Sequence, residues 1–380
     1  MRRPDPPQRT VLIVSPGAEL YGSDRMVVAT AAALIGSGRR VVVALGADGP
    51  LISMIERTGA AVVVCPTPVL RKRYLSPVGL VQLAGQAVRQ GAPAWKLLRS
   101  VRPQTMIVNT LTAPLWFVLG RAARTRVVCH IHEAEASVHP LVRKALYAPL
   151  ALADRCLINS RFSLGVVRRE APRAARRTRI VYNEVAGPPH VVPPREAVEG
   201  PVRLLFVGRL SERKGPHVAV DALGRLREAG VTASLTLAGA VFPGNEAYEE
   251  RLRARVDELG LSERVTFLGF VDDVWAQAAQ ADIWLVPSTV DEPFGNVAVE
   301  ASLAARPQVV SDIAGLKEAS AHASAVVLVP PQDAGALADA IARIVAEWPG
   351  YRAKALADVA VVADHFSAER YASGIVAAVE

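Results

Sequence analysis

Residues 187–201 read GPPHVVPPREAVEGP, and this stretch decides how the chain is divided. It holds five prolines and two glycines. Each proline removes a backbone donor and resists helix, so we expect a linker here. At 380 residues the chain is long enough for two domains of ordinary size, one on each side of this linker.

On the N-terminal side of the linker, short runs rich in Val and Ile alternate with longer amphipathic segments. Such apolar runs are typical of parallel strands buried on both faces, and the segments between them have helical spacing. The expected strands are Val11–Val14, Val41–Leu45, Ala61–Cys65, Thr105–Val108, Arg126–His130 and Arg155–Ile158. The clearest expected helices are Asp24–Ser37 and Pro140–Ala151. The alternation predicts a doubly wound parallel sheet.

On the C-terminal side of the linker the same pattern begins again. The expected strands are Val202–Val207, Ser234–Ala238, Val265–Phe267, Ile283–Val286, Gln308–Val310 and Ala325–Leu328, and the expected helices include Pro216–Ala229 and Tyr248–Leu259. The sequence therefore predicts an α/β protein with two Rossmann-like domains, residues 1–186 and 202–363. In open parallel sheets ligands bind beyond the carboxyl ends of the strands, so the loops that follow strands should carry the chemistry.

Charge is distributed unevenly between the halves of the chain. Residues 1–200 hold 28 Lys+Arg and 12 Asp+Glu, a net charge of +16. The remainder of the chain holds 16 Lys+Arg and 24 Asp+Glu, a net charge of −8, so the whole chain has a net charge of +8. The basic clusters of the first half are either solvated helix ends or a surface for anionic lipid headgroups, polyanions or a phosphorylated substrate. No apolar run is long enough to span a bilayer, and the three cysteines lack metal or redox spacing. We expect a cytoplasmic protein, with association to the inner face of the membrane as an open possibility.

Two loops of the first half are candidate binding segments. After the first strand comes SPGAELYGSDR, in which Gly17 and Gly22 allow tight turns and the start of the next helix would attract a phosphate. The alternative is a turn capped by Ser23 or Asp24. After the strand at residues 126–130 comes HIHEAEAS, in which His132 is placed to donate to a phosphate or a sugar hydroxyl, or else is satisfied by the neighbouring carboxylate. No carboxylate spacing completes a metal site with these histidines.

Three loops of the second half follow strands in the same way. In GRLSERKG, Gly208 lets the backbone pass close to a ligand, and Arg209 and Lys214 could neutralise a departing pyrophosphate. In LAGAVFPG, Gly239 would admit a flat ligand such as a base or a ribose. A base could also lie against the backbone at residues 270–271, Phe270 and Val271, while Asp272 and Asp273 are read as helix caps rather than metal ligands.

The stretch STVDEPFGNVAVEASL, residues 288–303, places Glu292 and Glu300 around a Phe-Gly-Asn turn. Paired carboxylates can act as acid and base in glycoside hydrolysis. Here both would lie near a helix N-terminus, whose field lowers carboxyl pKa values and favours hydrogen-bond acceptors over proton donors. We therefore interpret the pair as two fixed acceptors.

Taken in order, four of these segments resemble the retaining glycosyltransferases of family 4 (glycosyl transferases group 1), which have the GT-B fold. The segments are YGSDR, HIHE, GRLSERKG and VPSTVDEPFGNVAVEAS, and the resemblance covers nearly the whole chain. It implies two Rossmann-like domains facing across a cleft, with residues 364–380 crossing back to the first. It also implies transfer of a sugar from a nucleoside-diphosphate sugar to an acceptor hydroxyl, with retained anomeric configuration and without a metal or other cofactor.

The resemblance also implies a role for each matched position. Arg209 and Lys214 would bind the donor diphosphate, Glu292 the hydroxyls of the donor sugar, and Glu300 the ribose, while His132 would lie beside the reacting carbon. The other implied donor contacts are Gly22 and the backbone amides of Phe294, Gly295, Asn296 and Val297.

Two departures from the family pattern affect the acceptor side. Tyr21 replaces a glycine, so Tyr21 and Ser23 are the candidate acceptor contacts, and Glu184 stands where a glycine is common. The acceptor would be a glycan, glycolipid or small molecule, in polysaccharide, glycolipid or glycoconjugate biosynthesis. The alternatives are a nucleotide-sugar 2-epimerase of the same fold and, from another class, a basic polyanion-binding protein. No nucleic-acid reader motif and no dinucleotide GxGxxG fingerprint is present.

Overall fold

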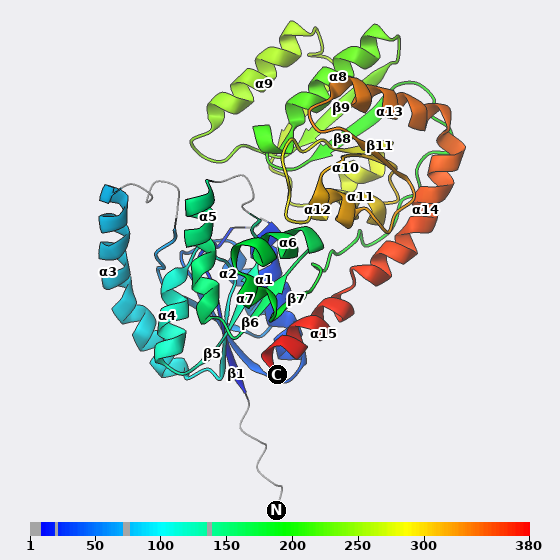
Figure 1. The fold of residues 1–380 in the computed structure, drawn as a ribbon. Helices are drawn as coiled ribbons and strands as arrows, with labels where there is room; N and C mark the ends of the chain where they lie inside the picture. Colours follow the sequence, from blue (N-terminus) through cyan, green and yellow to red (C-terminus); the bar gives the residue numbers. More distant parts are fainter. Residues whose placement is uncertain (1–8, 20–21, 71–76, 135–138) are drawn as a thin grey trace, which may run out of the picture. The chain divides into compact units, whose positions relative to one another are not determined.

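The computed structural model describes residues 9–19, 22–70, 77–134 and 139–380. The chain divides into two compact units: the first domain, Met1–Glu184 with Ala368–Glu380, and the second domain, Val185–Ser367. Each contains one parallel sheet covered by helices, the α/β class that the sequence predicts (Figure 1). The expected limits at residues 186 and 364 differ from this division by a few residues.

The first domain has a parallel sheet with the strand order β3-β2-β1-β4-β5-β6-β7 over its described residues. Its strands are β1 (Thr10–Ser15), β2 (Arg40–Leu45), β3 (Ala61–Val64), β4 (Thr105–Val108), β5 (Arg126–Ile131), β6 (Arg155–Ile158) and β7 (Thr178–Ile180). Its helices are α1 (Gly22–Gly36), α2 (Leu51–Arg57), α3 (Pro77–Val101), α4 (Pro114–Ala122), α5 (Pro140–Tyr147), α6 (Arg161–Glu170), α7 (Pro172–Ala175) and α15 (Ala368–Val379), with a 3₁₀ turn at Ala148–Leu152.

Side-chain alternation along the central strands divides the core of the first domain into two layers. In β1, Val11 and Ile13 pack in one layer with residues of α1, α2 and α15. Leu12 and Val14 pack in the other with residues of α3, α4, α5 and α6. Because successive side chains of a strand point to opposite faces, both faces must be covered, and the strand reads as a continuous apolar run.

The last helix, α15, belongs to the first domain although the whole of the second domain precedes it in the chain. Tyr371 of α15 is buried, and its hydroxyl lies 2.7 Å from Thr30 Oγ1 in α1. Ile375 is fully buried in the same layer. The C-terminal helix therefore completes the core of the domain that begins the chain.

The second domain has a parallel sheet with the strand order β10-β9-β8-β11-β12-β13. Its strands are β8 (Val202–Val207), β9 (Ala233–Ala238), β10 (Val265–Gly269), β11 (Ile283–Val286), β12 (Gln308–Ser311) and β13 (Val326–Val329). Its helices are α8 (Pro216–Glu228), α9 (Glu246–Glu258), α10 (Trp275–Gln280), α11 (Asn296–Leu303), α12 (Ala314–Ala319), α13 (Ala334–Ala346) and α14 (Trp348–His365), with a 3₁₀ turn at Glu212–Lys214.

The proline-rich segment 187–201 is not a free linker, because it is bound to the second domain. Arg195 Nη2 donates to the fully buried Asp282 carboxylate at 2.6 Å, and Trp348 Nε1 donates to the Arg195 carbonyl at 3.0 Å. Arg306, also buried, donates to the Val192 carbonyl at 3.0 Å. The prolines prevent regular structure, as expected, but side chains of the second domain satisfy the carbonyls that the segment leaves open.

All twelve expected strands are present, four of them with the expected ends and eight with an end shifted by one or two residues. Among the elements that were not named in advance, one strand and one long helix lack a clear sequence signal. The strand β7 has three residues, none of them buried, so it lacks the apolar signal of its neighbours. The helix α3 spans 25 residues, and its exposed side carries valines, which obscures the usual amphipathic pattern.

Candidate functional site

The strand order of each sheet identifies the edge at which a ligand should bind. In the second domain β8 lies between β9 and β11, so the chain leaves β8 toward one side and returns beside it at β11. This is a topological switch point, where the loops after adjacent strands diverge and leave room for a ligand. The segments GRLSERKG and STVDEPFGN follow β8 and β11, so both motifs lie at this one edge.

The backbone beyond β8 and β9 is closely packed at two glycines. Gly208 has φ +148° and Gly239 φ +157°. A Cβ on Gly239 would lie 1.9 Å from the Gly208 carbonyl oxygen, so a side chain is excluded there. Gly239 also donates its N–H to the Gly269 carbonyl at 2.8 Å, which ties this loop to β10. In the structure these glycines let two loop backbones pack closely against each other, and their expected contacts with a ligand stay predictions.

Arg209, the first cation after β8, is held against an aromatic ring. Its guanidinium carbon lies 3.5 Å from the centroid of Phe242 in the loop after β9. Stacking of this kind fixes the plane of the guanidinium and keeps its charge. Phe242 was not among the residues predicted from the sequence, although its place in the loop AGAVFPG after a strand was the available signal.

Lys214 ends the 3₁₀ turn, and the turn is locked onto the loop after β11. Gly215 has φ +71°, and a Cβ there would lie 2.0 Å from the Pro287 carbonyl oxygen. Thr289 N donates to the Arg213 carbonyl at 2.9 Å, and its hydroxyl donates to the Glu212 carbonyl at 2.8 Å. These contacts set the position of Lys214 relative to the second motif.

Glu292 is the partner of Lys214. The ammonium lies 2.6 Å from Oε1 and 2.7 Å from Oε2 of the carboxylate, and Ser288 Oγ donates to Oε1 at 2.8 Å. Burial by itself would raise the pKa of Glu292, but the Lys214 charge, the two hydrogen bonds and the Arg213 charge together hold it below its ordinary value. The carboxylate is therefore ionised at neutral pH and acts as an acceptor.

The turn that follows Glu292 is fixed by packing on both sides. Phe294 is buried, with its ring 5.5 Å from that of Phe366 in an edge-to-face arrangement. Gly295 has φ +109°, and a Cβ there would lie 2.2 Å from Leu316 Cδ2. A Cβ on Gly315 of α12 would lie 1.9 Å from the Glu292 carbonyl oxygen. The side chain of Phe294 is thus a core residue, and only its backbone amide remains a candidate contact.

The helix α11 begins at Asn296, with Gly295 as its N-cap. Glu300 is on the second turn and half-buried, as is Val297 on the first turn. The first amides of a helix point beyond its end and favour an anion there. Glu292 precedes the helix and Glu300 is within it, so the two carboxylates belong to different local structures, as the sequence predicts.

Phe270 and Val271 directly follow β10, the edge strand of this sheet. The side chain of Phe270 is 56% exposed. The neighbouring Asp273 accepts a hydrogen bond from the Trp275 amide at 2.9 Å at the start of α10. Asp273 thus binds the first amide of α10 from just outside the helix, while a capping role for Asp272 stays a prediction.

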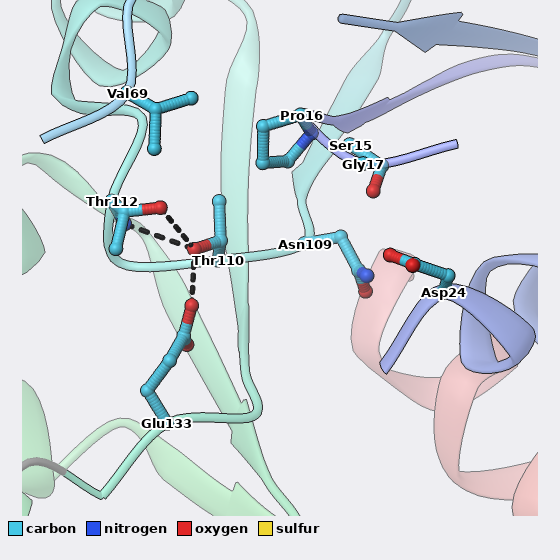
Figure 2. Close-up of a pocket in the computed structure, with 9 residues that line it drawn as sticks. All are labelled: Ser15, Pro16, Gly17, Asp24, Val69, Asn109, Thr110, Thr112 and Glu133. Carbon is cyan, nitrogen blue, oxygen red and sulfur yellow. Dashed lines mark hydrogen bonds between the residues drawn. The ribbon is translucent and has the colours of Figure 1, made fainter. Parts of the chain in front are cut away.

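The first domain has a pocket of about 270 Å³ at its own switch point, between β1 and β4. Figure 2 shows its lining, which comes from the ends of β1, β4 and β5, the start of α1 and the loop after β3. The described lining residues are Ser15, Pro16, Gly17, Asp24, Val69, Asn109, Thr110, Thr112 and Glu133. The charged members of this set, Asp24 and Glu133, are both acidic, in contrast to the basic composition of the first half.

A hydrogen-bond chain orders the far side of this pocket. The Thr110 hydroxyl donates to Glu133 Oε1 and lies 2.8 Å from the Thr112 hydroxyl (Figure 2). Burial raises the pKa of Glu133, while this hydrogen bond and those from backbone amides oppose that rise. The segment NTLT at residues 109–112 was not identified from the sequence, although polar residues directly after a buried strand were the available signal.

His132 lies just beyond β5, beside this pocket. Its Nε2–H donates to Asn109 Oδ1 at 2.9 Å, and burial lowers its pKa to about 4. The ring is therefore neutral at physiological pH, with Nδ1 unprotonated. His130, whose ring lies 4.1 Å away, is fully buried inside the sheet. The ring of His132 is satisfied by an amide rather than by the neighbouring Glu133 carboxylate.

The remaining first-domain candidates lie at the start of α1. Gly22 and Ser23 are its first two residues, and Tyr21 lies outside the described residues. Asp24, two positions on, lines the pocket, and a Cβ on Gly17 would lie 2.6 Å from its Oδ1. In the described part of the chain, no group of three or more His, Cys, Asp or Glu residues is arranged to hold a metal ion.

Comparison with known proteins finds a family match within the second domain. Residues 192–357 match the family model described as glycosyl transferases group 1. The glycogen synthase of Mycobacterium tuberculosis is 38% identical over 144 residues, 37% of this chain and 33% of that protein. The chain thus spans about a third of the length of such relatives. The 2-deoxystreptamine glucosyltransferase of Streptomyces kanamyceticus is 27% identical over 374 residues, 89% of this chain and 92% of that protein.

Solved structures resemble the whole chain. The Anabaena protein Alr3699/HepE, solved in complex with UDP-glucose, has a TM-score of 0.81 at 22% identity and covers 97% of this chain and 98% of its own. The sucrose-phosphate synthase of Thermosynechococcus elongatus has a TM-score of 0.76 at 21% identity, covering 97% and 98%. These likenesses confirm the expected two-domain GT-B fold.

Proposed function

We propose that this chain, whose second domain is a glycosyl transferases group 1 domain, moves a sugar from a nucleoside-diphosphate sugar to an acceptor hydroxyl with retained anomeric configuration. The observation that carries the proposal is the Lys214–Glu292 pair at the switch point of the second domain. A buried carboxylate and a partly exposed ammonium, placed together at that edge, suit a ligand that carries both hydroxyls and a diphosphate.

The cations of this edge would bind the diphosphate. Arg209 is oriented by Phe242, and Lys214 is held in place by its turn and by Glu292, so both charges are set in position before a ligand arrives. Cations fixed in this way stabilise a leaving diphosphate without reorganisation during the reaction. The amides at the start of α11 would add donors, and Glu300 would accept from the ribose hydroxyls.

Glu292 would accept from the hydroxyls of the donor sugar and would not act as a proton donor. Its lowered pKa keeps it ionised, and the carboxylate is already hydrogen-bonded to Ser288 and Lys214. In the retaining mechanism that we propose, an oxygen of the leaving phosphate takes the acceptor proton on the same face of the sugar. No protein carboxylate is then needed as the base, and no metal is needed for charge neutralisation.

The pocket of the first domain would hold the acceptor. Its two carboxylates and its threonine hydroxyls favour a neutral or amine-bearing group rich in hydroxyls over a phosphate at that position. His132 stays neutral beside it, and because its Nε2–H is bound to Asn109, the ring would accept at Nδ1 one hydrogen bond from a hydroxyl of the reacting sugar. Tyr21 and Ser23 remain proposed acceptor contacts.

We also propose that the reaction belongs to polysaccharide, glycolipid or glycoconjugate synthesis at the inner face of a membrane. The support for a membrane location is the basic first half of the chain, with a net charge of +16 over residues 1–200 (28 Lys+Arg, 12 Asp+Glu). Among the described helices, none is both long and apolar enough to cross a bilayer. We propose a peripheral contact with the membrane.

Donor binding and turnover test the proposal directly. A thermal-shift panel of UDP, GDP and their sugars should raise the melting temperature with one base, and release of the nucleoside diphosphate should report turnover even without an acceptor. Lys214→Ala should reduce that release about 100-fold or more. The matched control is Lys317→Ala on α12, whose exposed pair with Asp312 lies in the same domain and should leave release unchanged.

Two further arms test the mechanism. Release should be unaffected by EDTA, and product NMR should show the anomeric configuration of the donor. The proposed transferase activity would be refuted if no nucleotide raised the melting temperature, or if the Lys214→Ala variant released the nucleoside diphosphate as fast as the native chain. The match to the group 1 family model does not favour the alternatives, a nucleotide-sugar 2-epimerase and a polyanion-binding protein. Epimerisation of the nucleotide sugar at C2 without an acceptor would support the epimerase.

A further inference from the structure

The helix α3 exposes an apolar stripe to solvent. Val78, Val81 and Val88 have 69%, 73% and 80% of their surface exposed. Their spacing of three and seven residues puts them on one face of the helix, and the exposed Ala92 continues that face. The solvent side of a helix is ordinarily polar, so this stripe calls for a partner.

The C-terminal half of α3 is packed into the core of the first domain. Ala94 and Leu98 are buried in the core layer that α4 also covers, and Trp95 packs against that layer. In the N-terminal half the valines face away from the domain, and α3 forms one flank of it (Figure 1). The core therefore holds the helix in place without covering the stripe.

The charges around the stripe are all of one sign. Arg89 lies at its edge, and Lys96 and Arg99 continue the same face toward the C-terminus of α3; all three are exposed. From residue 57 to residue 132 the sequence contains eleven Lys+Arg and not one Asp or Glu. An apolar strip flanked by cations complements a surface that is apolar beneath and anionic at the top.

We infer that the exposed face of α3 docks onto an anionic lipid bilayer, with the three valines among the acyl chains and Lys96 and Arg99 at the headgroups. Amphipathic helices bind membrane interfaces in this way, by apolar burial together with attraction to anionic lipid. A second copy of the chain is disfavoured as the occupant, because it would bring the same cations against this face. The inference specifies the surface for the membrane location proposed above and rests on that part of the proposed function.

Vesicle binding of two substituted chains tests the inference. The full chain is sedimented with vesicles of phosphatidylcholine alone or mixed with phosphatidylglycerol, at low and high salt. Val81→Asp/Val88→Asp should weaken binding to the anionic vesicles by about tenfold for each valine. Lys96→Gln/Arg99→Gln should weaken it by about fivefold for each charge at low salt and have little effect at high salt.

The controls separate docking from folding and from turnover. Val361→Asp on α14, an exposed valine of the second domain at 55%, should bind vesicles like the native chain. Circular dichroism and the nucleotide thermal shift should be unchanged in the Val81→Asp/Val88→Asp chain. Vesicle binding without any nucleotide response would refute the transferase and leave the docking face standing.

Three outcomes would overturn the inference. The first is native-like vesicle binding by the Val81→Asp/Val88→Asp chain. The second is binding that high salt abolishes entirely and that extends equally to RNA or heparin, which would indicate electrostatic attraction to polyanions alone. The third is a dimer in size-exclusion chromatography that the valine substitutions dissociate while vesicle binding persists, which would make the stripe a contact between copies.

Discussion

Replacing Lys214 by Met should destabilise the second domain in a pH-dependent way. The ammonium lies 2.6 Å from a carboxylate that is only 6% exposed, and after the substitution Glu292 keeps the Ser288 hydrogen bond but loses its main counter-charge. Removing one partner of a buried pair costs about 3–5 kcal/mol. Because the Lys214 side chain is 30% exposed, water weakens the native pair, and we expect about 3 kcal/mol at pH 7.5.

The sign of the pH dependence follows from the pKa of Glu292. In the native chain this pKa is lowered, so the stabilisation is complete above the unfolded value of about 4.3 and is lost as the pH falls through the folded pKa. Without Lys214, burial dominates and the pKa rises, so the variant is stabilised at low pH and loses that stability as the pH rises through the new value. The difference in the free energy of unfolding between the native chain and the Lys214→Met variant should therefore shrink to below about 1 kcal/mol near pH 4.5.

Urea unfolding followed by circular dichroism at the two pH values measures this difference. Lys214→Met/Glu292→Gln should recover part of the lost stability, because no uncompensated buried charge remains. Lys317→Met, which breaks an exposed pair, should change the free energy of unfolding by less than about 1 kcal/mol at both pH values. A loss that is the same at both pH values, or one below about 1 kcal/mol at neutral pH, would refute the reasoning.

Three further substitutions test other parts of the second domain. Glu300→Gln should weaken nucleotide binding about tenfold, as expected for one hydrogen bond to a charged group, with little change in kcat. Calorimetry that shows unchanged nucleotide binding, together with kinetics that show a lowered kcat, would contradict the proposal that Glu300 binds the ribose. Gly239→Ala should cost about 2 kcal/mol or more, because its Cβ would lie 1.9 Å from a carbonyl oxygen, whereas Gly350→Ala, with open space around it, should be neutral or stabilising in the same unfolding assay. Asp282→Asn should cost about 3 kcal/mol, since this fully buried carboxylate binds two arginines, and should make residues 187–201 sensitive to limited proteolysis; unchanged cleavage would mean that the prolines alone hold that segment.

The strands and the loops that follow them could be predicted because their signals are local. A parallel strand covered on both faces must be apolar along its length, and glycines and cations directly after it stand out in the sequence. Gly208, Lys214 and Gly295 were identified on this basis. The segment 187–201 was also visible from its prolines, but its attachment through Asp282 was not, since that residue lies far along the chain.

Other site residues could not be predicted because their positions depend on strand order. The ring of Phe242 stacks on the guanidinium of Arg209 only because β9 lies beside β8. Asn109 and Thr110 line a pocket with Asp24 because β4, rather than β3, is the neighbour of β1. Strand order is decided by which helices cover which face, and a run of apolar residues does not encode it locally.

The two carboxylates of STVDEPFGNVAVEASL show which features the sequence determines and which depend on the tertiary structure. The sequence by itself determined that Glu292 and Glu300 lie on either side of a glycine turn after a buried strand, and that neither suits proton donation. Only the tertiary structure decided that Glu292 is paired with Lys214, 78 residues earlier in the chain. The physical reason is the parallel sheet: it places the carboxyl ends of β8 and β11 side by side, and burial of Glu292 there requires a cation within hydrogen-bonding distance.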